Sequence, residues 1–179
     1  MFYFTTHPSP IGSLTLACDG DSLIGLWIDG QKYHGCAIFK AMTERADIPV
    51  FDAVKEWLAR YFAGKKPGIS EAPLSPVGSE FRQSVWRALC EIPYGAVTTY
   101  GDIAREIAGG MNRKSMSGQA IGGAVGHNPV SIIIPCHRVV GANGSLTGYA
   151  GGIAVKRKLL ELEGVDMSGL FTPTKGSAL

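Results

Sequence analysis

The sequence lacks the features that mark membrane proteins, secreted proteins and strongly basic nucleic-acid-binding proteins. No apolar run approaches the roughly 20 residues that a membrane-spanning helix needs. The start of the chain, Met1–Thr5, has neither the charged nor the apolar region of a signal peptide, so we expect a cytoplasmic protein. The four cysteines show no CxxC spacing, and without an export signal each is treated as a thiol: Cys18, Cys36, Cys90 and Cys136.

Charge is nearly balanced over the 179 residues, with a formal net charge of +2. Residues 1–78 hold seven Lys/Arg against eight Asp/Glu, whereas residues 79–165 hold nine against six. The second half is thus net positive, which permits DNA binding but does not by itself indicate it. With 45% hydrophobic residues and no internal repeat, the chain is predicted to form one large or two small globular domains.

The first half of the sequence shows the strand-like alternation of apolar and polar residues that is typical of a small β-sheet. Short β-prone runs separated by Pro, Gly and Asp-Gly predict an antiparallel meander: Met1–Thr6, Ser13–Ala17 and Leu23–Ile28. Apolar residues between Phe51 and Phe62 then recur at helical spacing. We therefore expect an α/β domain over residues 1–78, ending in a Pro/Gly-rich linker at 64–78.

The second half is predicted to be mainly helical over residues 79–167. Helices are expected at Ser79–Glu91, from a cap at Thr98 or Thr99 to Ala108, and from a cap at Ser115 or Ser117 to Val125. The last two, joined by a short loop, fit a helix-turn-helix. A buried strand at Ser131–Ile134 and a helix at Gly152–Glu163 should follow, and residues 168–179 are expected to be a disordered tail.

Cys136 is the strongest candidate for chemistry. Most free cysteines are small buried hydrophobes, and Cys18, Cys36 and Cys90 are interpreted in that way. Cys136 differs because His137 and Arg138 follow it directly, and a nearby base or cation produces the reactive thiolate at neutral pH.

Glu163 is the second unusual residue. Projected at 100° per residue, it lies on the apolar face of the last helix with Val155, Leu159, Leu160 and Leu162, and in the last turn, where the helix dipole opposes negative charge. Both effects penalise an ionised acid, so Glu163 should be protonated or partnered, with His137 the best candidate. The alternative is that Glu163 ends the helix and frays into solvent.

Several motifs in register resemble one family. Pro135–Val139 resembles the active-site motif of the O6-alkylguanine-DNA alkyltransferases, also called methylated-DNA–protein-cysteine methyltransferases. The resemblance covers about Ser79–Val165 strongly and the first half, including Ser9–Gly12, more loosely. The further matching segments are Phe81–Trp86, Ile92–Gly95, Thr98–Ala104, Gly122–Ala124, Asn128–Val130, Gly148–Gly152 and Leu159–Gly164.

The resemblance implies a ribonuclease-H-like first domain, a winged helix-turn-helix in the second, and direct repair of alkylated guanine. The damaged base is flipped into a pocket and its alkyl group passes irreversibly, once per molecule, to Cys136. Glu163 orients His137, which takes the thiol proton through a water, and Tyr100 supplies a proton to guanine. On its residue type alone, Tyr100 is a core aromatic. O4-alkylthymine is a further possible substrate of this chemistry.

The remaining pocket assignments also follow from the resemblance. Asn128 ties the recognition helix to the active-site loop, although Asn-Pro alone is only a turn signal. Carbonyls of Cys136 and Val139 would accept hydrogen bonds from the guanine amino group. Tyr149 would form a pocket wall, and Ala150 and Gly151 belong to the loop that closes over the base, with the Ala150 amide facing O6. Arg138 is expected to be structural.

The DNA-contacting residues are expected at the second helix, which in this family enters the minor groove. Ser117, Gly118 and Gln119 begin that helix; Gln119 stands where many members of the family carry the arginine that fills the gap left by the flipped base. Arg113 and Lys114 could supply phosphate contacts or be solvated charges. We expect a shallow salt dependence, with about three phosphates neutralised. Close helix–helix packing is the alternative explanation for the small residues.

Double-stranded DNA is thus the expected partner of a monomer that needs no metal or other cofactor. A zinc set of His7, Cys18, His34 and Cys36 matches no standard spacing. Three other functions compete: a winged-helix regulator, a damage-recognition protein of the alkyltransferase-like class that transfers nothing, and a cysteine hydrolase. The regulator leaves Glu163 unexplained, the intact Cys136 argues against the second, and no oxyanion hole is identifiable for the third.

Overall fold

The computed structural model describes residues 1–34 and 41–174, which divide into two compact units. Unit 1 comprises Met1–Val77 and Pro129–Ile133, and unit 2 comprises Gly78–Asn128 and Ile134–Leu179. The chain therefore returns to unit 1 between two segments of unit 2 of similar length, and the expected division near residue 78 did not include this return. In the described parts of the chain, no helix has the length and apolar character needed to cross a membrane.

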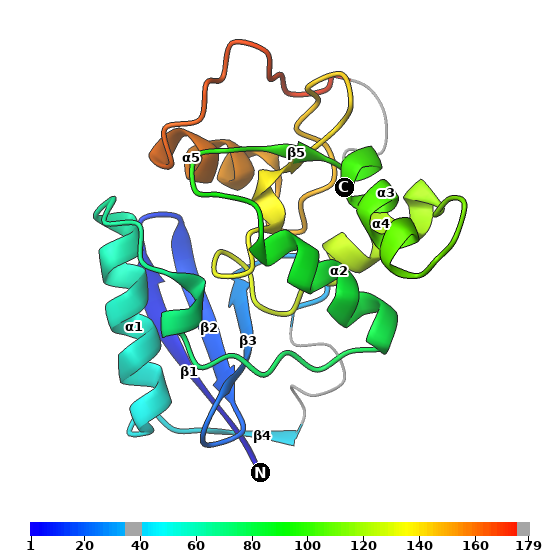
Figure 1. Cartoon of the computed structure of the whole chain (residues 1–179). Coiled ribbons are helices and arrows are strands. Elements are labelled where there is room, and N and C mark those ends of the chain that lie inside the picture. Colours follow the sequence, from blue (N-terminus) through cyan, green and yellow to red (C-terminus); the bar gives the residue numbers. More distant parts are fainter. Residues whose placement is uncertain (35–40, 175–179) are drawn as a thin grey trace. The chain divides into compact units, whose positions relative to one another are not determined.

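Unit 1 is built on a four-stranded sheet of order β3-β2-β1-β4 (Figure 1). The expected antiparallel meander is present as β1 (Phe2–Ser9), β2 (Gly12–Cys18) and β3 (Leu23–Ile28). A fourth strand, β4 (Met42–Glu44), was not predicted and pairs in parallel with the first residues of β1. Among residues 1–34 and 41–174, no strand pairs with that edge of β1 beyond Phe4, so Pro8 can lie within β1 without removing a hydrogen bond from the described sheet.

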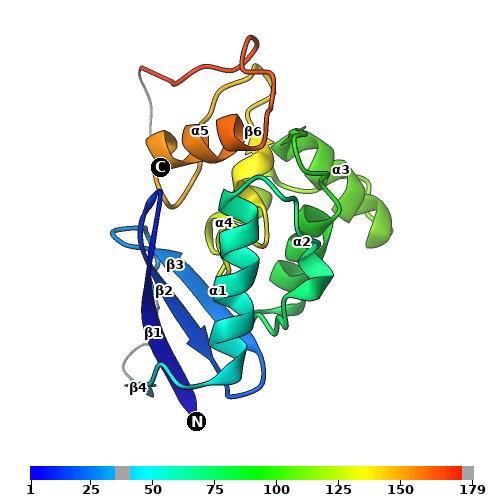
Figure 2. The same cartoon turned by 90° about the vertical axis from the view of Figure 1, so that its left-hand side faces the viewer.

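Helix α1 (Pro49–Phe62) lies against the sheet, as Figure 2 shows, and its apolar residues are the buried ones. Proline at the first position starts the helix two residues earlier than the periodicity indicated, since its missing N–H would have no partner there. The side chains of this buried face are Val50, Phe51, Val54, Trp57, Leu58 and Tyr61.

The segment expected to be a linker is packed into unit 1. It contains a short 3₁₀ helix, Ile69–Glu71, and the indole of Trp57 donates to the carbonyl of Gly68 at 2.8 Å. The next residues pair with the free edge of β3: the Leu23 amide donates to Pro73 at 2.7 Å, with an isolated bridge between Leu23 and Leu74.

Unit 2 is a group of helices with a two-stranded parallel ribbon, β5 (Thr98–Thr99) and β6 (Val139–Val140). Helices α2 (Glu80–Cys90), α3 (Tyr100–Gly110) and α4 (Gly118–Gly126) pack on one another. The last helix, α5 (Ile153–Leu162), contacts the 3₁₀ turn Cys136–Arg138. The expected caps are present at Thr99 and Ser117, each of which accepts the amide three residues later. Ser79, which was expected to be the first residue of its helix, caps α2 in the same way. The Trp86 indole fixes α2 to α4 by donating to the carbonyl of Ala124 at 2.9 Å.

Two predictions in this half were wrong. Ser131–Ile134 is a buried turn rather than a strand, because an apolar run of this length does not distinguish the two and Ile132 adopts a φ of 72°. The tail is also ordered at its start: Phe171 bridges Ser145, and Met167 and Leu170 pack on an apolar cluster that includes Leu160. The rest of the expected tail, residues 175–179, lies outside the described residues.

Candidate active site

Cys136 lies at the start of a 3₁₀ turn, Cys136–Arg138, directly after Pro135. Pro135 has a φ of −83° and a ψ of 61°, and the Cys136 amide donates to the Ile134 carbonyl at 2.8 Å, which together form an inverse γ-turn. The Asn128 side-chain nitrogen donates both to that same carbonyl, at 2.8 Å, and to the Cys136 sulfur, at 3.0 Å. The side chain at the end of α4 is thus attached to the cysteine loop.

The buried thiol needs a base before it can act as a nucleophile. Cys136 is only 4% exposed, and burial raises the pKa of its thiol, because the thiolate would lose its hydration. The Asn128 hydrogen bond and the charge of Lys156 lower the pKa of Cys136 again, but by less than burial raises it. The resting form is therefore the thiol.

His137, directly after this cysteine in the chain, and Glu163 form a buried pair in unit 2. Both side chains are fully buried, and the imidazole Nε2 lies 2.7 Å from Glu163 Oε1. Because a carboxylate only accepts, Nε2 carries the proton and Nδ1 presents its lone pair; Nδ1 has no hydrogen-bond partner among the described residues. Burial, together with the charges of Arg138 and Lys156, lowers the pKa of His137 although Glu163 acts to raise it, so the imidazole is neutral and able to accept a proton.

Arg138 keeps Glu163 ionised. Its guanidinium donates from Nε and Nη2 to the two carboxylate oxygens, at 2.8 and 3.0 Å, and from Nη1 to the Ile92 carbonyl. The Gly95 amide donates to the same carboxylate at 3.2 Å. Burial alone would raise the pKa of Glu163, but the hydrogen bonds from His137 and Arg138 outweigh it and bring the pKa to about 2. The partnered arrangement is thus present, and the solvent-exposed alternative for Glu163 is wrong.

The ionised Glu163 should make stability depend on pH in acid. Because its folded-state pKa of about 2 lies below the ordinary 4.5, its contribution is complete above pH 4.5 and is lost as the pH falls towards 2. That contribution is on the order of 3 kcal/mol. Urea unfolding at about pH 6 and about pH 3 tests this: the stability advantage of the wild type over Glu163→Gln should shrink at the lower pH.

A matched control lies on the same helix. Glu161 is exposed and pairs with Arg157 on the surface, so Glu161→Gln should show the acid sensitivity of the wild type. A stability difference between wild type and Glu163→Gln that is the same at both pH values would contradict the assignment.

Lys156 is a site residue that the sequence interpretation missed. Its side chain is completely buried, and its Nζ donates to the carbonyls of Val139 and Thr147. Burial lowers the pKa of Lys156 to about 8, and the nearby Cys136 opposes this shift. A signal was available, since at 100° per residue Lys156 falls within about 20° of Glu163 on the helix projection. Leu162, which was placed on the apolar face, is instead 36% exposed.

Tyr100 and the loop before α5 lie close together. The Tyr100 hydroxyl is placed to donate to the carbonyls of Gly148, at 3.1 Å, and Thr147, at 3.3 Å. A Cβ on Gly148 would lie 2.3 Å from that hydroxyl, and φ there is +82°, so only glycine fits. Burial, and then the proximity of Cys136, raise the pKa of Tyr100, which keeps the phenol protonated.

The other expected pocket residues also belong to unit 2. Tyr149 is buried with its ring edge-on to His137, the centroids being 6.4 Å apart. Ala150 and Gly151 follow it, half-buried, before α5. Val139 is fully buried and pairs with Thr98 in the β5–β6 ribbon.

The residues expected to contact DNA form a separate, exposed group. Gly118 and Gln119 begin α4 after the cap Ser117, and Arg113 and Lys114 lie in the preceding loop. A Cβ added at Gly118, Gly122 or Gly123 would meet no atom within 4 Å. Close helix–helix packing therefore does not explain these glycines, and the surface of α4 is open to an external partner.

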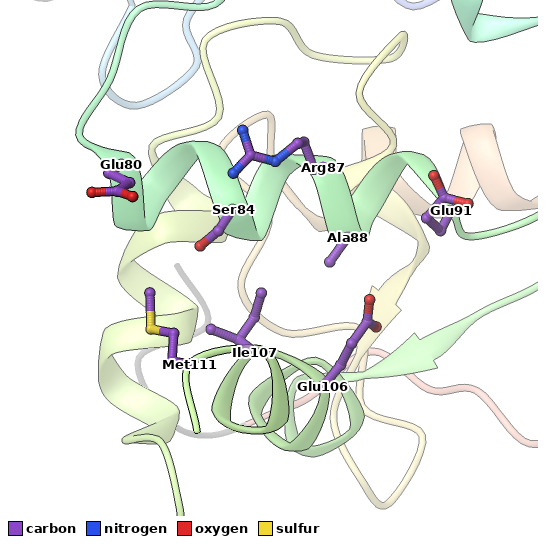
Figure 3. A pocket seen from close by; sticks show the side chains of 9 residues that line it. Glu80, Ser84, Arg87, Ala88, Glu91, Glu106, Ile107 and Met111 are labelled. Atoms are coloured by element: carbon purple, nitrogen blue, oxygen red, sulfur yellow. The ribbon is translucent and has the colours of Figure 1, made fainter. Parts of the chain in front are cut away.

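One surface pocket, of about 450 Å³, lies between α2 and α3 (Figure 3). Figure 3 shows Ser84 and Ala88 of α2 pointing towards Ile107 and Glu106 of α3. Its lining includes no residue of the cysteine site. Within the described ranges no three His, Cys, Asp or Glu side chains are grouped to hold a metal ion, and Cys36 of the zinc set considered above lies outside those ranges.

Unit 2 thus combines a buried cysteine, a buried imidazole–carboxylate pair and an exposed helix rich in small residues. The chain belongs to the 6-O-methylguanine DNA methyltransferase family. The model of the family's DNA binding domain matches residues 80–165, and that of its ribonuclease-like domain matches residues 2–76. The resemblance is confirmed, and with it a two-domain fold with an N-terminal sheet domain and a helical C-terminal domain.

Close relatives cover nearly the whole chain. It is 43% identical over 161 residues to the methylated-DNA–protein-cysteine methyltransferase of Haemophilus influenzae, with 90% of this chain and 86% of the relative covered. It is 43% identical over 164 residues to the Mycobacterium tuberculosis protein of the same name, with 91% and 93% covered. The crystal structure of M. tuberculosis OGT in complex with DNA gives a TM-score of 0.77 at 42% identity, covering 90% of this chain and 92% of that one.

Proposed function

We propose that this protein repairs double-stranded DNA by removing the alkyl group from O6-alkylguanine and keeping it on Cys136. The observation that carries the proposal is the buried Glu163–His137 pair, whose Nδ1 lone pair remains available next to the cysteine. Relatives at 43% identity that are named methylated-DNA–protein-cysteine methyltransferases support it. The protein is thus a methyltransferase that uses itself as acceptor.

The transfer requires one proton movement and one displacement. His137 takes the thiol proton through a water, and Glu163 stabilises the imidazolium that forms. The Cys136 sulfur then attacks the alkyl carbon in line, so that the S–C bond forms while the bond to O6 breaks. The Asn128 amide and the Lys156 ammonium offset the negative charge on sulfur before the attack. No step regenerates the thiol, so each molecule reacts once.

The departing guanine takes up a proton from Tyr100. A phenol with a raised pKa stays protonated until negative charge develops on the purine ring, which is when the proton is needed. The carbonyls of Cys136 and Val139 accept hydrogen bonds from the guanine amino group. The Cys136 carbonyl already accepts a hydrogen bond from the Val139 amide, and the Val139 carbonyl accepts one from Lys156 Nζ. The second lone pair of each carbonyl oxygen is offered to the base. Tyr149 stacks as a wall, and the amides at Ala150 and Gly151 close the pocket over O6.

DNA binds through α4 and the loop that precedes it, which complete a winged helix-turn-helix supported by α3 and acting as a monomer. Helix α4 enters the minor groove, where its glycines let the backbone approach. Gln119 fills the space of the flipped base and bonds the orphaned cytosine, and Arg113 and Lys114 contact phosphates. The DNA complex of the M. tuberculosis homologue supports DNA binding.

The glycine surface of α4 provides a sharp prediction. Gly123 lies one turn after Gln119, exposed, with room for a Cβ in the free protein. Gly123→Ala should stabilise the helix by up to about 1 kcal/mol, since glycine is a poor helix former. The same methyl group should hold DNA away and weaken binding about tenfold, or ~1.4 kcal/mol. Thermal unfolding and fluorescence-anisotropy titration of a labelled duplex measure the two effects.

Gly109→Ala is the matched control. Gly109 also lies in a helix with open space at its Cβ, but in α3. Its replacement should raise stability without changing the dissociation constant. Equal DNA affinity for the Gly123→Ala variant and the wild type would show that this face of α4 does not contact DNA.

Stoichiometry with the free base O6-benzylguanine tests the proposed reaction without DNA. The protein should release one guanine per molecule and then stop. Continued release would indicate a hydrolase, and no release together with unimpaired DNA binding would indicate a regulator.

A further inference from the structure

The stretch that joins Asn128 to Cys136 is held outside the unit that contains both residues. Residues Pro129–Ile133 belong to unit 1. The Leu26 amide donates to the Pro129 carbonyl at 2.8 Å, and the Ser131 amide donates to the Leu26 carbonyl at 2.9 Å. The stretch thus extends the sheet of unit 1 at the free edge of β3.

A buried polar pair strengthens this attachment. Gln31 follows β3 and is 7% exposed, and Ser131 is 2% exposed. The Ser131 hydroxyl donates to Gln31 Oε1 at 3.0 Å, and the same oxygen accepts the Ile28 amide at 2.8 Å. A buried hydroxyl that loses its acceptor is costly, so the pair fixes where Ser131 lies.

Directly after Ser131 the backbone is strained. Ile132 has a φ of 72°, and the Ile133 amide donates to the Ser131 carbonyl at 2.9 Å, which makes a γ-turn with the central residue in the left-handed region. A β-branched residue adopts this conformation only where its surroundings impose it. Here the surroundings are the bonds of Ser131 to Leu26 and Gln31.

The strained turn leads into the cysteine loop within two residues. The Ile134 carbonyl accepts both the Asn128 side chain and the Cys136 amide. A relaxation at Ile132 would rotate that carbonyl, and the Asn128 nitrogen that also donates to the Cys136 sulfur would move with it. The first domain would in this way act on the reacting sulfur through the chain itself.

We propose that Gln31 and Ser131 are positioning residues for alkyl transfer: their buried hydrogen bond holds the γ-turn at Ile132 and thereby the contact between Asn128 and the Cys136 sulfur. The inference rests on the proposed function for its rate measurement. It gives unit 1 a role in the reaction.

Gln31→Met and Ser131→Ala test the pair in the full-length protein. Each should slow transfer from O6-benzylguanine about tenfold, since small misplacements of reacting groups cost this much or more. The double variant should be no slower than the slower single variant, because both remove the same bond. The pH midpoint of Cys136 alkylation by iodoacetamide, followed by peptide mass spectrometry, should shift upward because the sulfur loses the Asn128 donor.

Controls separate positioning from loss of stability. Val54→Ala in the core of α1 destabilises unit 1 but should leave the rate and the alkylation midpoint unchanged below its unfolding temperature. Ser131→Thr keeps the hydroxyl and should retain the wild-type midpoint. Should Gln31→Met fail to fold, Ser131→Ala, which removes one oxygen, decides the matter.

A midpoint in Ser131→Ala equal to that of Val54→Ala would overturn the inference. If the wild type takes up no benzyl group, the proposed function fails, whereas the iodoacetamide midpoint still decides the positioning role.

Discussion

Glu163→Gln is expected to slow alkyl transfer to Cys136 by about 100-fold, the lower end of what general base catalysis contributes. Glutamine can still accept the Nε2 proton of His137, so the ring keeps a partner. The negative charge that stabilises the imidazolium is lost, however, and Arg138 keeps only one of its two acceptor oxygens. Single-turnover kinetics with O6-benzylguanine measures the effect.

The loss must be separated from instability, because removing one member of a buried ion pair costs about 3–5 kcal/mol. Rates should therefore be compared at a temperature where circular dichroism shows the variant folded. Glu161→Gln, the same change on the exposed side of α5, should react at the wild-type rate. A Glu163→Gln rate within twofold of the wild type would remove the acid from the mechanism.

Lys156→Met is expected to slow transfer about tenfold at neutral pH and to change the shape of the pH profile. Methionine fills similar space but brings no charge to offset the thiolate. Lys156 has a pKa of about 8, so it is charged below that pH and loses its charge above it. The wild-type rate should accordingly fall as the pH rises through about 8, and this fall should be absent in the variant.

The measurement is the second-order rate constant for O6-benzylguanine from about pH 6 to about pH 10. Tyr100 does not interfere, because its raised pKa keeps it protonated. Lys158→Met is the control, since Lys158 is exposed on the same helix. A fall near pH 8 that persists in Lys156→Met would assign the titration to another group.

Local signals predicted the helices of unit 2 well. Serine and threonine caps, apolar periodicity and terminal glycines are all short-range signals, and the caps Thr99 and Ser117 were among the candidates identified from them. Pairings between distant segments were not predictable in this way. Residues 131–134 have the composition of a buried strand, but their conformation is set by Leu26 and Gln31, about a hundred residues earlier in the chain.

In the candidate site, too, features set by local sequence were predictable and those set by distant segments were not. Glu163 could be found because a charge on an apolar helix face requires a partner. Lys156 occupies the same face but was not singled out, since a lysine is usually assumed to extend its ammonium into water. Its two carbonyl acceptors come from other segments, and only the folded chain brings them to α5. The roles of Tyr100 and Asn128 followed from family resemblance rather than from residue type.

The most direct test of the central claim is peptide mass spectrometry after mixing the protein with a duplex that contains one O6-methylguanine. The account predicts one methyl group per molecule, on the peptide bearing Cys136, with unmodified guanine restored in the DNA and no reaction in Cys136→Ser. A methyl group on Cys18 or Cys90 instead, or more than one guanine repaired per molecule, would contradict it.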